Sequence, residues 1–217
     1  MLNIRPKFGP VFEKNPRGRL LSAAASLFSK NGINATGIDR VIEDAGTAKT
    51  TLYSAFGSKE GLVVAVLEAE SDAWLDWFSK EINKVKGSGR DKLVATFTIL
   101  QKWFEHDKFY GCPLFNAMAE APASDTQIRK ITFNHRSTLE RQLKVLALED
   151  GLDNVDRLVS ELMILFDGAI ISASISRDPN AAKSAASAFA TILSRSTRVA
   201  PVKSEERYEN LAKMAVE

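Results

Sequence analysis

Residues 44–62 of this 217-residue chain read DAGTAKTTLYSAFGSKEGL, and the pattern of this stretch decides the fold. A Gly and a Thr precede a short polar run, and a long segment with apolar periodicity follows it. Apolar residues lie along one side of a predicted helix, at spacings of four and three: Ala48, Leu52, Ala55 and Phe56. Polar residues occupy the exposed arc of the same helix: Lys49, Thr50, Tyr53 and Ser54. This arc is too polar to be core, and the glycines on both sides predict an ordered helix between two turns.

Two more helical segments precede this stretch. The apolar residues of 16–31 recur at helical spacing, with a Pro suited to the first position and a Gly suited to the stop. Thr36 stands three residues before Asp39, close to the spacing of a capping box, so we expect it to begin a short helix that ends at Gly46. Two short helices joined around a Gly predict a helix-turn-helix, whose second helix can enter a DNA major groove. Periodicity alone fits a solvated helix hairpin equally well, because this geometry also occurs without DNA.

The rest of the chain also has the pattern of helices, and no segment has a convincing strand pattern. Ser58 is predicted to cap a long helix that runs to about Lys86, where two glycines break it. Further helices are expected over residues 90–107, 113–121, 125–149, 155–177 and 180–197. The polar tail from Val199 is expected to hold at most a loose helix. The sequence therefore predicts an all-α fold.

Charge is distributed unevenly along the chain, although the formal net charge is only +2. Residues 1–59 hold nine Lys and Arg against four Asp and Glu, whereas the remainder is net acidic. The basic part is therefore N-terminal, where the predicted helix-turn-helix lies. The single cysteine, Cys112, excludes an intramolecular disulfide and suits a reducing cytosol.

The N-terminal segment carries charges and two early prolines where a signal peptide would have its apolar core. No apolar run approaches the ~20 residues that span a bilayer. We therefore expect a cytoplasmic protein without a membrane span.

Residues 17–62, RGRLLSAAASLFSKNGINATGIDRVIEDAGTAKTTLYSAFGSKEGL, resemble the DNA-binding domain of the TetR (tetracycline-repressor-like) transcriptional regulators. In that family a helix carrying AA..LF and a trailing Gly precedes T..I..I...AG and then TLY..F..K..L, and all of these positions are matched here. The resemblance implies a three-helix DNA-binding domain over residues 1–57 and a larger helical domain over residues 58–217 for effector binding and dimerisation. It also implies a homodimeric repressor that an unknown small-molecule effector releases from a palindromic operator in double-stranded DNA.

By motif position, the resemblance assigns eight residues to the DNA-facing set: Thr36, Thr47, Lys49, Thr50, Thr51, Tyr53, Ser54 and Lys59. Tyr53 and Lys59 would mainly contact phosphate. The residues expected nearest the bases are Lys49, Thr50 and Ser54. Many members of the family differ at Ala48, Thr50 and Ser54, so the operator sequence of another member does not transfer to this chain.

The larger domain holds aromatic and Met residues that are candidates for an effector pocket, with a few polar residues on apolar faces. The predicted effector-binding set is Phe97, Trp103, Phe104, Asn116, His135, Met163, Phe166 and Asp167. Further candidates of the same kind are Phe115, Met118 and Phe133. For each apolar residue taken alone, a place in the core is the commoner outcome, since helical domains need large side chains to fill space. Asp167 is the most suggestive, because a carboxylate within ILFDGAII is costly unless it is paired, hydrogen-bonded or facing a ligand.

Residues 168–194 contain two helical segments rich in Ala and Ser. Small residues let helices approach closely, and such a pair from each subunit can form a four-helix interface of the type the family uses. Ala also favours helix for its own sake. Since composition and resemblance agree, we favour the interface.

Two other classes of function compete with an effector-controlled repressor. An enzyme is disfavoured, because two His and one Cys cannot supply a metal site of ordinary spacing and no nucleophile elbow or phosphate-binding Gly loop occurs. We therefore predict no catalytic residues, no metal-binding residues and no cofactor. A DNA-binding scaffold without an effector is the alternative, and stabilisation by small molecules would distinguish the two. A redox role for Cys112 is disfavoured, since no second Cys exists to act as its resolving partner.

Overall fold

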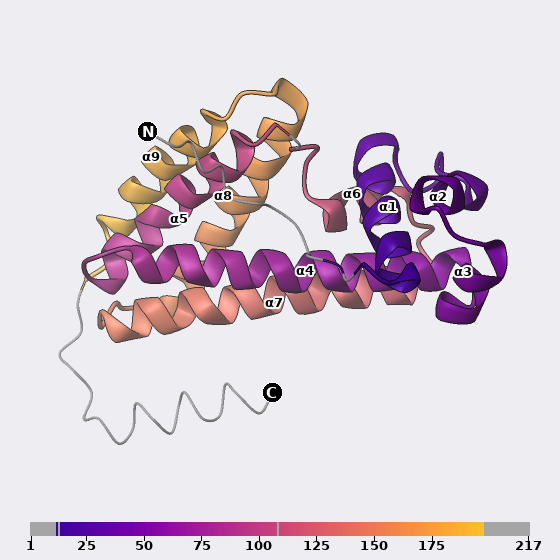
Figure 1. Ribbon diagram of the computed structural model, residues 1–217. Helices are drawn as coiled ribbons and strands as arrows, with labels where there is room; N and C mark the ends of the chain where they lie inside the picture. The colour runs from indigo at the N-terminus through magenta and orange to yellow at the C-terminus, as the bar shows by residue number, and fades with distance from the viewer. Residues whose placement is uncertain (1–11, 13, 108, 198–217) are drawn as a thin grey trace, which may run out of the picture. The chain divides into compact units, whose positions relative to one another are not determined.

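The computed structural model describes residue 12, residues 14–107 and residues 109–197 (Figure 1). These residues form α-helices and contain no strand, so the predicted all-α fold is confirmed for them. The helices in chain order are α1 (Pro16–Asn31), α2 (Ile38–Ala45), α3 (Lys49–Phe56), α4 (Lys59–Lys84), α5 (Gly89–Phe104), α6 (Pro113–Glu120), α7 (Thr126–Glu149), α8 (Val155–Ser176) and α9 (Ala181–Leu193). The tail from Val199, for which a loose helix was the expectation, lies outside the described residues.

The chain divides into two compact units. The first unit comprises Met1–Trp77 and Tyr110–His135, and the second comprises Phe78–Phe109 and Arg136–Glu217. Two helices, α4 and α7, continue from one unit into the other. The first unit therefore joins the predicted DNA-binding helices to α6, which comes from much later in the chain.

The first three helices begin and end at residues with clear local signals. Asn15 accepts a hydrogen bond from the Gly18 N–H at 2.8 Å and caps α1, with Pro16 at the first helical position. Gly46 ends α2 in the left-handed region, with φ of 57°, which few residues other than Gly adopt without strain. The Ser58 hydroxyl accepts a hydrogen bond from the Gly61 N–H at 3.1 Å, so the predicted cap of α4 is confirmed.

The core of the helix-turn-helix forms where α1 packs against α2 and α3. Its most buried side chains are Leu20, Ala24, Val41 and Leu52. Arg19 locks the turn from α1, because its guanidinium donates to the Ala45 carbonyl at 2.9 Å and to the Gly46 carbonyl at 3.3 Å. These carbonyls lie at the C-terminal end of α2, where a cation satisfies otherwise unpaired acceptors. The turn before α3 is therefore held from behind by a buried apolar core and an arginine.

The second unit is a helical bundle in which α8 and α9 pack on each other and on α5. Its core holds Phe97, Leu162 and Phe189, all almost fully buried. In this unit α4 is linked to α7 by a hydrogen bond that the Ser79 hydroxyl donates to the Gln142 side-chain oxygen at 3.2 Å.

Among the described residues, one helix, α8, is long and apolar enough by length and composition to cross a membrane. It has 22 residues, and its most apolar 18-residue window has a mean hydropathy of 1.8. The buried helix of a water-soluble core passes the same test, and 44% of this window is buried inside the protein. Because one side of α8 packs on α9 and α5, its apolar character is accounted for in part by the core.

Candidate nucleic-acid interface

The exposed arc of α3 is the candidate DNA-reading surface. Leu52 is fully buried and fixes the helix on the core, while Lys49, Thr50 and Ser54 are exposed on its outer side. Tyr53 on the same arc is 45% exposed. The Lys49 ammonium lies 3.2 Å from a carboxylate oxygen of Asp39, and both groups are open to solvent. A solvated ion pair of this kind is weak, so the ammonium is available to a phosphate or a base edge.

Thr36 departs from the predicted DNA-facing set. Its side chain is only 3% exposed, and its hydroxyl donates to the Gly32 carbonyl at 2.6 Å. The predicted capping role is also wrong, because Gly37 is the N-cap of α2 and no side chain caps this helix. Because the Gly32 carbonyl at the end of α1 accepts this bond, Thr36 closes the α1–α2 loop instead of facing outward.

Thr47, Thr51 and Lys59 are only partly exposed. The Thr47 hydroxyl is buried, with no hydrogen-bond partner among the described residues. The Lys59 ammonium donates to the Ile33 carbonyl at 2.7 Å and so ties the start of α4 to the α1–α2 loop. A phosphate contact from Lys59 would therefore compete with a contact that shapes the first unit.

Two residues that the sequence patterns did not single out shape this surface. Arg17 lies over the Phe56 ring, with its guanidinium carbon 5.0 Å from the ring centroid, and so supports the end of α3. Glu120, the last residue of α6, accepts hydrogen bonds from the Ile33 N–H at 3.1 Å and the Asn34 N–H at 2.7 Å. The Asn34 side chain returns a bond to the Glu120 carbonyl at 3.2 Å. The α1–α2 loop is therefore clamped by α6, which no local sequence pattern reveals.

Six of the eight predicted effector-binding residues lie in the second unit, where the apolar ones are core residues. Phe97 packs on Phe189 with ring centroids 5.8 Å apart. Trp103 and Phe104 contact Phe109, with ring centroids 5.2 and 4.9 Å away. The other two are also buried: Met163 and Phe166.

The sixth residue, Asp167, has the partner that its place in an apolar helix requires. One of its oxygens lies 2.8 Å from Nη1 of Arg136. The N–H of Nη1 is not directed at this oxygen, so the contact is an ion pair without a hydrogen bond. Burial raises the pKa of Asp167 to about 6, and the Arg136 charge opposes the rise. Both side chains remain about one third exposed, so the pair can still be reached by a ligand.

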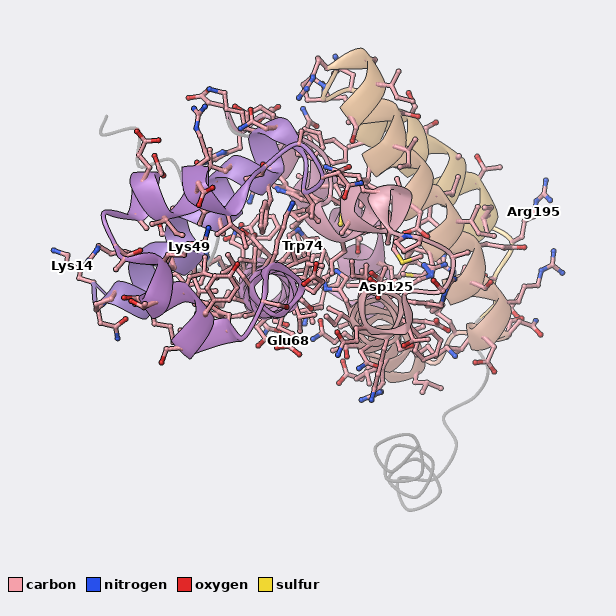
Figure 2. All side chains as sticks on the ribbon, turned by 90° about the vertical axis from the view of Figure 1, so that its right-hand side faces the viewer. Lys14, Lys49, Glu68, Trp74, Asp125 and Arg195 are labelled. Carbon is pink, nitrogen blue, oxygen red and sulfur yellow. The ribbon has the colours of Figure 1, made fainter. Side chains whose placement is uncertain are left out.

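The remaining two residues, Asn116 and His135, belong to the first unit. The Asn116 amide donates to the Tyr110 carbonyl at 3.0 Å. Nδ1 of His135 lies 2.9 Å from the Ser71 hydroxyl. The imidazole ring makes an edge contact with Trp74 (labelled in Figure 2), with ring centroids 5.3 Å apart. Burial lowers the pKa of His135 to about 4, so the imidazole is neutral at neutral pH. Within the described residues, no group of three or more His, Cys, Asp and Glu is arranged to hold a metal ion, and Cys112 is buried.

Comparisons with known proteins agree on one family. The sequence model of the bacterial regulatory proteins of the tetR family matches residues 20–66, from within α1 to the first part of α4. The HTH-type transcriptional repressor KstR2 of Mycobacterium tuberculosis is 26% identical over 137 residues, which cover 63% of this chain and 66% of that protein. The HTH-type transcriptional regulator QacR of Staphylococcus aureus is 33% identical over 106 residues, which cover 49% of this chain and 53% of that protein. The matched stretch thus spans less than two thirds of the length of either relative.

A solved structure has the same fold over most of the chain. SCO4454, a TetR-family transcriptional regulator from Streptomyces coelicolor, superposes with a TM-score of 0.76 at 24% identity. The superposition covers 84% of this chain and 89% of the other. At this level of identity the likeness extends to the fold alone.

Proposed function

Because this chain belongs to the TetR family of bacterial regulatory proteins, we propose that it is a cytoplasmic homodimer that binds a palindromic operator in double-stranded DNA. It represses the neighbouring genes until a small-molecule effector releases it. The observation that carries the proposal is the polar, exposed arc of α3 on a helix whose opposite side is fixed by fully buried Leu52. A recognition helix needs this combination of a rigid back and a polar front.

Each side chain of the arc has a separate role in the proposal. Lys49, Thr50 and Ser54 lie nearest the base edges and set the sequence preference. Tyr53 and the partly exposed Thr51 contact phosphate. Thr47, whose hydroxyl is buried, only lines the edge of the interface. Lys59 is retained only as an edge contact, because its ammonium already donates to a backbone carbonyl.

The dimer is proposed to form through α8 and α9. Three isoleucines on α8 are exposed although they are large and apolar: Ile164, Ile171 and Ile175. Their spacing of seven and four places them on one side of the helix, and exposed Gly168 lies within the same stripe. An apolar stripe on a helix that also has a small residue is suited to close packing against the same stripe of a second subunit.

The effector is proposed to bind near Phe104, Phe166 and the Asp167–Arg136 pair, which supplies a partly exposed charge. Its binding would tilt α4, which begins only two residues after α3 ends, and so change the separation of the two recognition helices. A ligand shifts this equilibrium only through its different affinities for the two states. Saturating operator must therefore weaken effector binding by the factor by which effector weakens operator binding.

The experiment is selection of bound DNA from a random pool with the full chain and two variants. We expect an inverted repeat with half-sites about one helical turn apart. Lys49→Ala should change the selected bases, whereas Tyr53→Phe should weaken binding to all sequences alike. Recovery of asymmetric single sites, or identical profiles for both variants, would contradict the proposal.

A DNA-binding scaffold without an effector is the competing function. A ligand that binds only the folded protein must raise its melting temperature. Melting temperatures measured with a panel of metabolites therefore distinguish the two functions. A melting temperature that no metabolite raises would favour the scaffold.

A further inference from the structure

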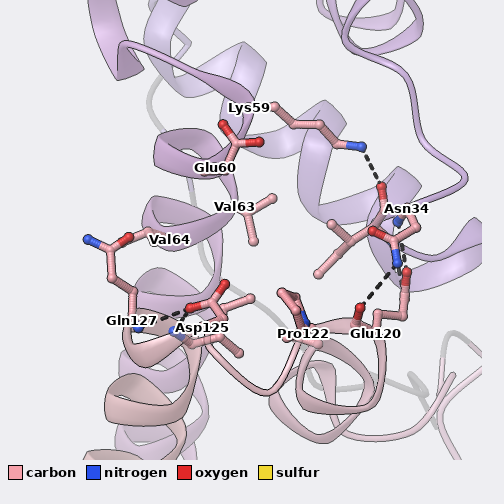
Figure 3. Close-up of a pocket in the computed structure, with 13 residues that line it drawn as sticks. Asn34, Lys59, Glu60, Val63, Val64, Glu120, Pro122, Asp125 and Gln127 are labelled. Carbon is pink, nitrogen blue, oxygen red and sulfur yellow. Dashed lines mark hydrogen bonds between the residues drawn. The ribbon is translucent and has the colours of Figure 1, made fainter.

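A pocket lies within the first unit, beside the helix-turn-helix. Its volume is about 270 Å³. It is bounded by the α1–α2 loop, the start of α4, the end of α6 and the start of α7 (Figure 3). None of the predicted effector-binding residues lines it. The pocket is therefore distinct from the proposed effector site.

The walls of this pocket are mostly apolar, and its charged groups lie around the rim. The apolar lining residues include Val63, Val64, Ala117, Ala121, Pro122 and Ile128. The charged lining residues are Lys59, Glu60, Glu120 and Asp125. An apolar cavity with a few convergent polar groups is the usual form of a small-molecule site, and the volume suits a ligand with one ring.

Two of the four charged groups are already engaged. The Lys59 ammonium donates to the Ile33 carbonyl at 2.7 Å. The two Glu120 oxygens each accept a backbone N–H, from Ile33 at 3.1 Å and from Asn34 at 2.7 Å. These contacts hold the α1–α2 loop and leave neither group directed at a ligand.

Of the other two, Asp125 has an oxygen that can face a ligand, and Glu60 adds a second negative charge. Asp125 uses a single oxygen, Oδ1, to accept the Gln127 and Ile128 N–H groups at 3.0 Å each. Figure 3 shows its second oxygen directed into the pocket, with Glu60 at the opposite rim. Hydrogen bonds from its own backbone N–H and from Ser58 hold the pKa of Glu60 below its usual range, so this group is ionised at neutral pH. The open rim thus presents two carboxylates and no free cation among the lining residues.

We propose that this pocket binds a small organic cation, an ammonium or amidinium group on an apolar body of about one ring. The ring would fill the space between Val63 and Pro122, and the cationic group would donate to the open oxygen of Asp125, with the Glu60 carboxylate adding negative charge at the rim. Charge-assisted hydrogen bonds of this kind are about twice as strong as neutral ones. The ligand would also touch Ile33, Asn34 and Lys59. The hydrogen bonds of these residues hold the α1–α2 loop, which precedes α2, and the start of α4, which follows α3.

The test uses the full chain without DNA, so its result does not depend on the proposed repressor function. Benzylammonium is titrated into ¹⁵N-labelled protein at pH 7, with benzyl alcohol as the neutral analogue of the same shape. We expect benzylammonium to shift the amide signals of Ile33, Asn34 and Gln127, with a dissociation constant of about 1 mM for a ligand of about eight non-hydrogen atoms. Benzyl alcohol should bind at least about tenfold more weakly.

Asp125→Asn removes the charge but keeps a side-chain oxygen to accept from Gln127 and Ile128, so the start of α7 stays capped. The variant should bind benzylammonium about tenfold more weakly and bind benzyl alcohol as tightly as the natural chain does. Asp72→Asn is the matched control, because Asp72 is exposed on α4 and does not line the pocket. Absence of benzylammonium binding, equal binding of both compounds, or equal loss in both variants would overturn the proposal.

Discussion

Glu70 on α4 is a largely buried carboxyl group, and replacing it by an uncharged residue gives the sharpest prediction about stability. It lines a small cavity of about 20 Å³ between α1, α4 and α6. The other lining residues are Ala25, Phe28, Ser29, Ile33, Val66, Leu67, Pro113, Asn116, Ala117 and Glu120. Glu120 is the only other ionisable group on this wall, and it carries the same charge. Burial raises the pKa of Glu70 from 4.5 to about 7.

The sign of the pH effect follows from the proton count. Between pH 4.5 and 7 the folded chain holds the Glu70 proton and the unfolded chain has released it, so the free energy of unfolding falls as pH rises. The loss is complete above pH 7, where both states are ionised. A pKa raised from 4.5 to about 7 corresponds to at most about 3 kcal/mol. Glu70 is partly exposed, which lowers the expected loss to about 1 to 2 kcal/mol.

Glu70→Gln keeps the size of the side chain and removes the ionisation. We expect the variant and the natural chain to unfold at the same urea concentration at pH 4.5, and the variant to be about 1 to 2 kcal/mol more stable at pH 8. Urea unfolding followed by circular dichroism at one fixed protein concentration measures the difference, since dimer stability depends on concentration. Glu68→Gln on the exposed side of the same helix (Figure 2) is the control and should show no such trend. A difference that does not grow with pH, or that the control shares, would refute the reasoning.

Two further predictions concern the clamp and the dimer. Glu120→Ala removes both acceptors for the Ile33 and Asn34 N–H groups, so the first unit should lose about 1 to 3 kcal/mol. Hydrogen exchange of these two amides should accelerate, and unchanged exchange would mean that the clamp does not hold the loop. Ile175→Glu changes a side chain that is 80% exposed, so helicity should persist while light scattering reports a monomer. A dimer that survives this change would place the interface elsewhere.

The helices could be predicted from the sequence because each has local start and stop signals. The predicted segment 16–31 coincides with α1, and Ser58 caps α4 as expected. The exposed arc of α3 followed from helical periodicity alone, since one buried residue, Leu52, orients the whole helix. Local pattern and tertiary packing agree in these elements, so sequence reasoning succeeds there.

The failures come from contacts between residues far apart in the chain, or from competition between two local partners. Glu120 reaches Asn34 across 86 residues, and no periodicity marks such a pair. The packing of α6 with the helix-turn-helix likewise joins segments that lie far apart in the sequence. Thr36 had the spacing of a capping residue, but Gly37 takes the N-cap position of α2, and the Thr36 hydroxyl donates to the Gly32 carbonyl.

His135 provides a last prediction, because its pH effect opposes that of Glu70 within the same unit. Burial lowers the pKa of His135 from 6.5 to about 4. Between those values the unfolded chain binds the proton and the folded chain does not, so the stability that neutral His135 supplies is present above pH 6.5 and lost as pH falls towards 4. The stability that protonated Glu70 supplies is lost in the opposite direction, as pH rises from 4.5 to 7.

The two windows overlap from pH 4.5 to 6.5, where folding releases about one proton at His135 and takes up about one at Glu70. Their contributions therefore cancel in the natural chain, and a single variant should expose the other group. His135→Asn, which keeps a polar group beside Ser71, should lose more stability relative to the natural chain at pH 6.5 than at pH 4.5, by about 1 to 2 kcal/mol. The Glu70→Gln variant should move the opposite way, and the double variant should regain the shallow pH profile of the natural chain. Urea unfolding at half-unit pH steps tests all three, and a double variant as steep as either single one would show that the two groups do not offset each other.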